Sequence, residues 1–292
     1  MKRILTAAFC LILTGGIAFG VSRLAGSFHF SKKKKLRAQG IELLRGGDAG
    51  GAVSAFDEAL AAAGDKSKTF NIDVLSYRAE AEMMLDDFEA AKHSWDLILE
   101  QGGDPISGRY MKSFCESRLG KDQAVALYRE ALGMEEKGKT SPGYEQALLA
   151  AGEACMEAGD HEGAKVLYEE ALRTTGGDGR FESRVRCQMG LYQMAEEDYE
   201  GAADSFYQGY DRLITSYKAG TGASLDQAAA AITEENQADW QLLKKLAFYQ
   251  AAVCEYMQNY EEAKSRFETY IQVFGPDEAA QHEIDFLNTR IR

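Results

Sequence analysis

Small and aromatic residues recur in a fixed order along this chain. In the first instance Gly40 is followed by a Gly-Asp pair at 47–48, then by Ala52, Phe56 and Ala59. The last three follow one another at intervals of four and three, which is the spacing of one helix face, and the Gly-Asp pair marks a turn. The pattern therefore predicts two helices of about fourteen residues joined by a short turn.

The same order recurs further along the chain. It is clear again around Gly152 and Gly190, and weaker copies fill the gaps between the clear ones. The alanines that follow the turns lie at 52, 91, 124, 164, 202 and 263, so the steps between copies are 39, 33, 40, 38 and 61 residues. The residues that we expect to pack these hairpins are Gly40, Ala52, Phe56, Ala91, Trp95, Ala124, Tyr128, Gly152, Ala164, Tyr168, Gly190, Ala202, Phe206, Ala263 and Phe267.

Each position in this order has a physical reason. A Gly or Ala on the first helix lets the second helix approach closely, and the turn-following alanine is the matching small contact. The turn ends one helix and caps the next, while the aromatic side chain fills the gap towards the following hairpin. Because one hairpin cannot bury its apolar face alone, the copies must stack.

This combination resembles the tetratricopeptide-repeat (TPR) family from about Leu36 to Phe274. The resemblance implies an all-α, right-handed superhelical solenoid of about six helix hairpins, and we assign residues 36–292 to this repeat domain. The 61-residue step predicts an irregular insertion at about 215–239, with a short helix capped by Ser224. That insertion is either a flap over the groove or an elongated hairpin with its loop. The apolar pattern over 277–291 predicts a capping helix.

The resemblance also implies the function of a non-enzymatic scaffold or adaptor that binds a protein or peptide in a concave groove lined by the first helix of each pair. The chain lacks the paired Lys and Asn with which one TPR subgroup clamps a peptide carboxylate. For every groove candidate, packing between neighbouring repeats is the alternative. The candidates are Tyr77, Met84, Arg109, Leu149, Glu153, Met156, Arg184, Leu191, Met194, Phe248 and Tyr256.

The N-terminus predicts a membrane connection. Lys2 and Arg3 precede a run from Ile4 to Val21 that has no charge, a length between those of a signal-peptide core and a membrane span. We therefore expect residues 1–22 to be a signal peptide or membrane anchor, followed by a basic linker at 23–35.

Two arguments about the direction of this segment oppose each other. The signal-like layout favours export, whereas the basic residues after the apolar run favour a cytoplasmic body for an uncleaved helix. Leu13-Thr14-Gly15-Gly16 resembles a bacterial lipoprotein signal, but Gly16 stands where the lipid-bearing cysteine is required. We therefore expect no lipidation, and both the exported and the cytoplasmic location of the body stay as alternatives.

Charge narrows the classes of partner. The first 37 residues hold eight basic residues and no acid, so the remainder carries 33 − 8 = 25 basic and 46 acidic residues, a net charge of −21. Such a body repels nucleic acid. The sequence contains no nucleotide-binding, hydrolase or metal-binding motif. His161 has no second histidine near it, so we interpret it as a turn residue rather than a metal ligand. We therefore predict that the protein binds no cofactor or metal and is not an enzyme. A membrane-surface sensor that uses the lysine run and the groove, or an enzyme of unrecognised type, are the alternatives.

Overall fold

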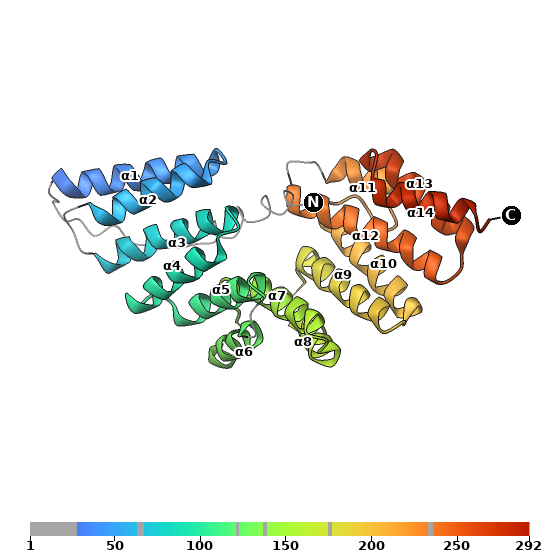
Figure 1. Cartoon of the computed structure of the whole chain (residues 1–292), viewed down its shortest axis with the longest axis horizontal. Helices are drawn as coiled ribbons and strands as arrows, with labels where there is room; N and C mark the ends of the chain where they lie inside the picture. Colours follow the sequence, from blue (N-terminus) through green and yellow to red (C-terminus); the bar gives the residue numbers. More distant parts are fainter. Residues whose placement is uncertain are drawn as a thin grey trace. The chain divides into compact units, whose positions relative to one another are not determined.

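In the computed structural model, all regular secondary structure in the residues that it describes is α-helical (Figure 1). The predicted signal or anchor segment lies outside these residues. The described ranges contain fourteen α-helices and fall into two compact units that divide between Ala154 and Cys155. The structure describes residues 28–62, 67–120, 123–136, 139–174, 177–232 and 236–291.

Ten of the helices form five hairpins of contacting neighbours, and the boundary between the two units falls within α7. The helical repeat confirms the predicted all-α architecture. Two further helices, α11 (Leu225–Ala231) and α14 (Glu278–Asn288), flank the last hairpin. The hairpins are α1 (Phe28–Arg45) with α2 (Ala49–Ala61), α3 (Lys68–Met84) with α4 (Phe88–Glu100), α5 (Pro105–Arg118) with α6 (Ala124–Met134), α9 (Gly179–Ala195) with α10 (Tyr199–Ser216), and α12 (Gln237–Tyr256) with α13 (Tyr260–Phe274). Between the third and fourth of these, α7 (Tyr144–Glu157) is followed along the chain by α8 (His161–Thr174).

The turns of the hairpins share one local design. Asp48, Asp87 and Asp198 each precede a second helix and accept a hydrogen bond from a backbone N–H in its first turn. The residue before each cap has a positive φ, a conformation that favours glycine. Gly47 meets this need in the turn between α1 and α2, whereas Glu197 adopts φ 61° in the turn between α9 and α10.

Glycine also sets the distance between paired helices. A Cβ added to Gly40 would lie 2.4 Å from Cε1 of Phe56, and one added to Gly190 would lie 2.5 Å from Cε1 of Phe206. Both rings are completely buried. The first-helix glycine therefore lies against the aromatic side chain sixteen positions later, whereas we predicted the turn-following alanine as its small partner and placed the aromatic ring towards the following hairpin.

The basic linker that we predicted at 23–35 needs correction from residue 28 onwards. Helix α1 begins at Phe28, so the lysine run lies within a helix. Lys33 is buried and its amine lies 5.9 Å from the ring centre of Phe70 on α3. Lysine is a good helix former, and its aliphatic stem can cover apolar surface while the amine faces a ring. The linker prediction treated these residues only as charges.

In the second unit α11 and α14 extend the core around the last hairpin. Ala228 and Ile232 at α11 are completely buried, and the Tyr210 hydroxyl donates to the carbonyl of Ala223 at 3.0 Å. Ser224 caps α11 as expected. Helix α14 is the predicted capping helix: it buries Ala280, Ile284 and Leu287, and it ends at Asn288. These two helices cover apolar surface that the hairpins leave open.

Candidate functional site

The groove candidates of the first unit contact neighbouring helices. Tyr77 stacks on Phe56 with ring centres 6.0 Å apart, and the guanidinium of Arg37 lies 5.1 Å from the centre of the Tyr77 ring. Arg37 in turn donates to Asp73. Met84 packs against the same apolar cluster as Phe56. These side chains connect the first two hairpins, which is the packing role that we gave as the alternative to ligand binding.

Helices α5 and α7 carry the remaining candidates of this unit. Nε of Arg109 lies 3.5 Å from a carboxylate oxygen of Glu130, and Glu153 lies 3.5 Å from Arg118. Leu149 is partly exposed. The charged candidates thus pair across neighbouring helices, and their ion pairs are partly exposed, so each contributes roughly 0–1 kcal/mol.

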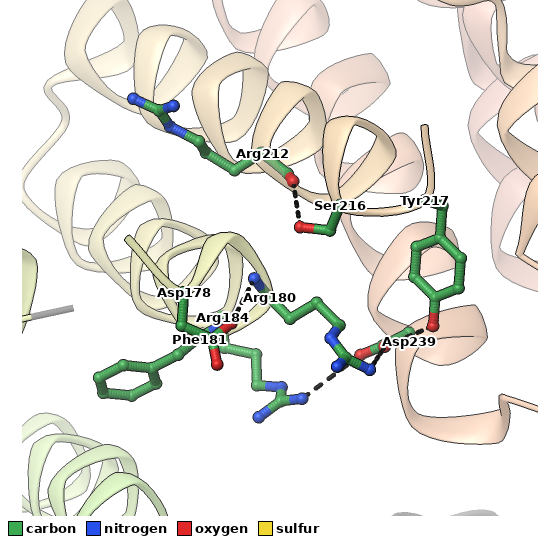
Figure 2. A network of polar contacts seen from close by, with 8 residues as sticks. All are labelled: Asp178, Arg180, Phe181, Arg184, Arg212, Ser216, Tyr217 and Asp239. Atoms are coloured by element: carbon green, nitrogen blue, oxygen red, sulfur yellow. Dashed lines mark hydrogen bonds and ion pairs between the residues drawn. The ribbon is translucent and has the colours of Figure 1, made fainter. Parts of the chain in front are cut away.

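In the second unit a buried carboxylate organises the first turns of α9. Asp239, at the start of α12, is only 4% exposed. Its Oδ2 accepts from the Tyr217 hydroxyl at 2.7 Å, and its Oδ1 accepts from Nη2 of Arg184 at 3.4 Å. Nη1 of Arg180 lies 3.6 Å from Oδ2 (Figure 2). A buried carboxylate needs such partners, because leaving it unpaired costs several kcal/mol.

This network joins three helices. Arg180 and Arg184 stand one turn apart on α9, Tyr217 directly follows α10, and Asp239 lies on α12 (Figure 2). The pKa of Tyr217 is raised to about 12, mainly by burial and next by the hydrogen bond to the Asp239 carboxylate. The hydroxyl therefore remains a donor at neutral pH. Both guanidinium groups are partly exposed to solvent.

Two apolar side chains lie further along α9 on the side that carries the two arginines. Leu191 and Met194 are partly buried and pack against the core of the second unit. At about 100° per residue, they fall on the side of the helix that carries Arg180 and Arg184, roughly 10 to 15 Å along its axis from Arg184. We call these four residues the α9 stripe: an arginine end held by Asp239 and an apolar end.

Other candidates of the second unit lie elsewhere. Phe248 contacts Phe267 of α13 edge to face, with ring centres 5.2 Å apart. It lies about half a turn around α12 from Asp239, so the structure does not bring it to the α9 stripe. Tyr256 ends α12 and stacks on Tyr199 at the start of α10. Met156 is partly exposed near the end of α7.

The packing residues predicted from the repeat pattern lie in the interior with one exception. Trp95 is only partly buried. The buried ones are Gly40, Ala52, Phe56, Ala91, Ala124, Tyr128, Gly152, Ala164, Tyr168, Gly190, Ala202, Phe206, Ala263 and Phe267.

The sequence reasoning missed Arg180, Tyr217 and Asp239. They are separated by 37 and 22 positions along the chain, and the last two lie within the predicted insertion at about 215–239. No periodicity within a helix connects them. The available signal was an aspartate at an otherwise apolar position near the start of α12.

Two further properties bear on function. Within the described ranges, no group of three or more His, Cys, Asp or Glu side chains is placed to hold a metal ion. Nor does any helix in those ranges combine the length and apolar character needed to cross a bilayer. His161 begins α8 and pairs with Glu196.

Comparison with known proteins shows the class of fold. No protein-family model matches the chain. Among solved structures it is similar to PilW, a widely conserved type IV pilus biogenesis factor, at 16% identity and a TM-score of 0.61, covering 87% of this chain and 97% of that one. It is also similar to the apo form of the quorum sensor NprR from B. thuringiensis, at 14% identity and a TM-score of 0.60, covering 88% and 69%.

A tetratricopeptide repeat protein from Parabacteroides merdae is a further structural neighbour, at 12% identity and a TM-score of 0.50, covering 88% of this chain and 99% of that one. At such identities the likeness concerns the fold alone. Together with the successive helix hairpins, it shows that this chain has the tetratricopeptide-repeat fold.

Proposed function

We propose that this protein is a non-enzymatic interaction scaffold that binds a protein or peptide segment on the α9 stripe. The observation that carries the proposal is the arginine pair, held by a buried carboxylate, on the same side of α9 as the partly exposed Leu191 and Met194. Side chains that are already ordered lose less conformational entropy when a ligand binds. Guanidinium groups recognise carboxylates and backbone carbonyls, and methionine adapts to varied apolar shapes.

A structure with this fold supports the choice of ligand class. NprR has been solved in complex with its cognate peptide NprX, and that structure matches 90% of this chain at 13% identity with a TM-score of 0.54. A tetratricopeptide-repeat fold thus accommodates a peptide in at least one neighbour. The chemistry of the α9 stripe favours a segment with a carboxylate near an apolar side chain.

Site-specific photocrosslinking in cells tests this proposal. A photoreactive phenylalanine analogue is placed at Leu191 and at Met194, with Val166 on α8 as the control because it is an exposed apolar residue on a second helix. We expect the same adduct from both stripe positions, absent from Val166 and lost on Arg180→Ala. An adduct of equal yield from Val166, or one indifferent to Arg180→Ala, would contradict the proposal.

We further propose that residues 1–22 target or tether this scaffold to a membrane, by the uncharged run that follows Lys2 and Arg3. Mass spectrometry of the mature N-terminus tests for cleavage, and alkaline extraction of membranes tests for anchoring. Protease access to the body in sealed vesicles distinguishes the two sides. An uncleaved chain recovered entirely in the soluble fraction would refute the membrane connection.

A further inference from the structure

Hairpin turns of the second unit meet at one edge. The first residue of α10, Tyr199, stacks on the last residue of α12, Tyr256, with ring centres 5.1 Å apart and planes at 18°. This contact brings the α9–α10 turn beside the α12–α13 turn. His161 at the start of α8 pairs with Glu196 in the α9–α10 turn, so the α7–α8 turn joins the same edge.

Apolar surface is exposed at this edge. Tyr256 is 56% exposed although it stacks on Tyr199, and the next residue, Met257, is 37% exposed. Tyr199 packs against the core of the second unit, whereas more than half of Tyr256 and part of Met257 remain accessible to a partner. The electron-rich faces of tyrosine rings attract cations.

The two turns that carry these rings contain acidic residues but no lysine or arginine. Residues 194–200 contain four acidic residues, residues 255–262 contain three, and neither segment contains a basic one. Glu262 pairs with Arg266 outside these segments, and Glu196 pairs with His161. Glu283 of α14 adds another carboxylate near Glu255, and burial followed by this neighbour raises the pKa of Glu255 to about 7.

We propose that this edge binds a lysine- and arginine-rich segment of a partner protein. The turn-edge patch consists of Tyr199, Tyr256, Met257 and the acidic residues of 194–200 and 255–262. A guanidinium or ammonium group stacks on the exposed face of Tyr256, while neighbouring basic groups pair with the carboxylates and aliphatic stems cover Met257. This basic segment has the opposite charge to the carboxylate-bearing segment proposed for the α9 stripe. Either proposal can therefore fail without the other.

Fluorescence anisotropy of the purified chain with a labelled peptide of alternating Lys and Arg tests the patch. Tyr256→Ser is expected to weaken binding about fivefold, whereas Tyr256→Phe retains it because the ring remains. Tyr207 on α10 is the matched control, since it is 57% exposed, and Tyr207→Ser should change Kd by less than about twofold.

A second pair of variants separates the patch from the general acidity of the body. Glu197→Gln with Glu200→Gln removes two charges from the patch, and Glu169→Gln with Glu170→Gln removes two from α8. Only the first pair should weaken binding by more than about fivefold at physiological salt. Circular dichroism verifies that each variant retains its helix content.

Three results would overturn the proposal. Equal losses in the two charge pairs would show attraction to the body as a whole. Equal binding of a peptide of alternating Leu and Ser would show a site for apolar segments. A change from dimer to monomer in sedimentation on Tyr256→Ser, with peptide affinity unchanged, would show that a second copy of the chain covers the patch.

Discussion

The carboxyl group of Glu80 provides a direct test of how burial controls stability in the first unit. Glu80 lies on α3 between two completely buried alanines and is only 9% exposed. Burial raises its pKa from 4.5 to about 7. The charged form loses hydration in this position, and that loss is what the higher pKa measures.

The sign of the effect on stability follows from proton binding. Between pH 4.5 and about 7 the folded chain holds this proton more tightly than the unfolded chain. The contribution of Glu80 to stability is therefore fully present below pH 4.5 and is lost as the pH rises through about 7. The shift corresponds to roughly 3 kcal/mol, at about 1.36 kcal/mol for each pH unit.

Glu80→Gln keeps the shape of the side chain and removes its charge. We expect the variant to be more stable than the parent at pH 8, by up to roughly 3 kcal/mol, and to differ little from it near pH 4.5. Urea unfolding followed by circular dichroism across this pH range measures the difference. The control is Glu58→Gln on α2, where the side chain is exposed.

The decisive observation is the pH dependence of the difference rather than its size at one pH. If the free energies of unfolding of the parent and Glu80→Gln run parallel from pH 4.5 to 8, the buried carboxyl does not titrate as described. If Glu58→Gln shows the same pH dependence as Glu80→Gln, general charge repulsion in the acidic body explains the result instead.

Three other substitutions test the packing and the network by urea or thermal unfolding. Gly190→Ala should lower the unfolding free energy by about 1–3 kcal/mol because its methyl group meets a buried ring. Gly133→Ala is the control: its added methyl group would have no neighbouring atom within 4 Å, so the substitution should be neutral or slightly stabilising. Equal effects of the two substitutions would refute the contact. Asp239→Asn should destabilise by roughly 2 kcal/mol because it weakens the hold on two arginines, and an unchanged melting temperature would contradict the network. Glu197→Gly should raise the melting temperature because a non-glycine residue at φ 61° costs about 1 kcal/mol, and a lower one would show that the glutamate side chain stabilises the turn.

The hairpins were predictable because their determinants are local. A glycine, a turn and an aromatic residue within sixteen positions define the close approach of two adjacent helices, as Gly40 with Phe56 and Gly190 with Phe206 illustrate. The start of α1 was not predictable in this way. A count of charges includes neither the helix propensity of lysine nor the contact of Lys33 with Phe70 on α3.

The candidate sites depended on contacts across longer separations. Asp239 meets Tyr217 and Arg184 over 22 and 55 positions, and Tyr256 meets Tyr199 over 57. These meetings follow from how successive hairpins stack and from the insertion between α10 and α12, neither of which leaves a periodic signal within one helix.

The sequence by itself therefore determined the repeated unit, since turn chemistry and small-residue spacing act over a single hairpin. The tertiary structure decided which partly exposed side chains share a surface and which pack between hairpins. It placed Arg184 beside a buried carboxylate and turned Phe248 towards α13. The physical reason is that burial and pairing of a side chain depend on neighbours from other hairpins, whose register the local pattern leaves undetermined.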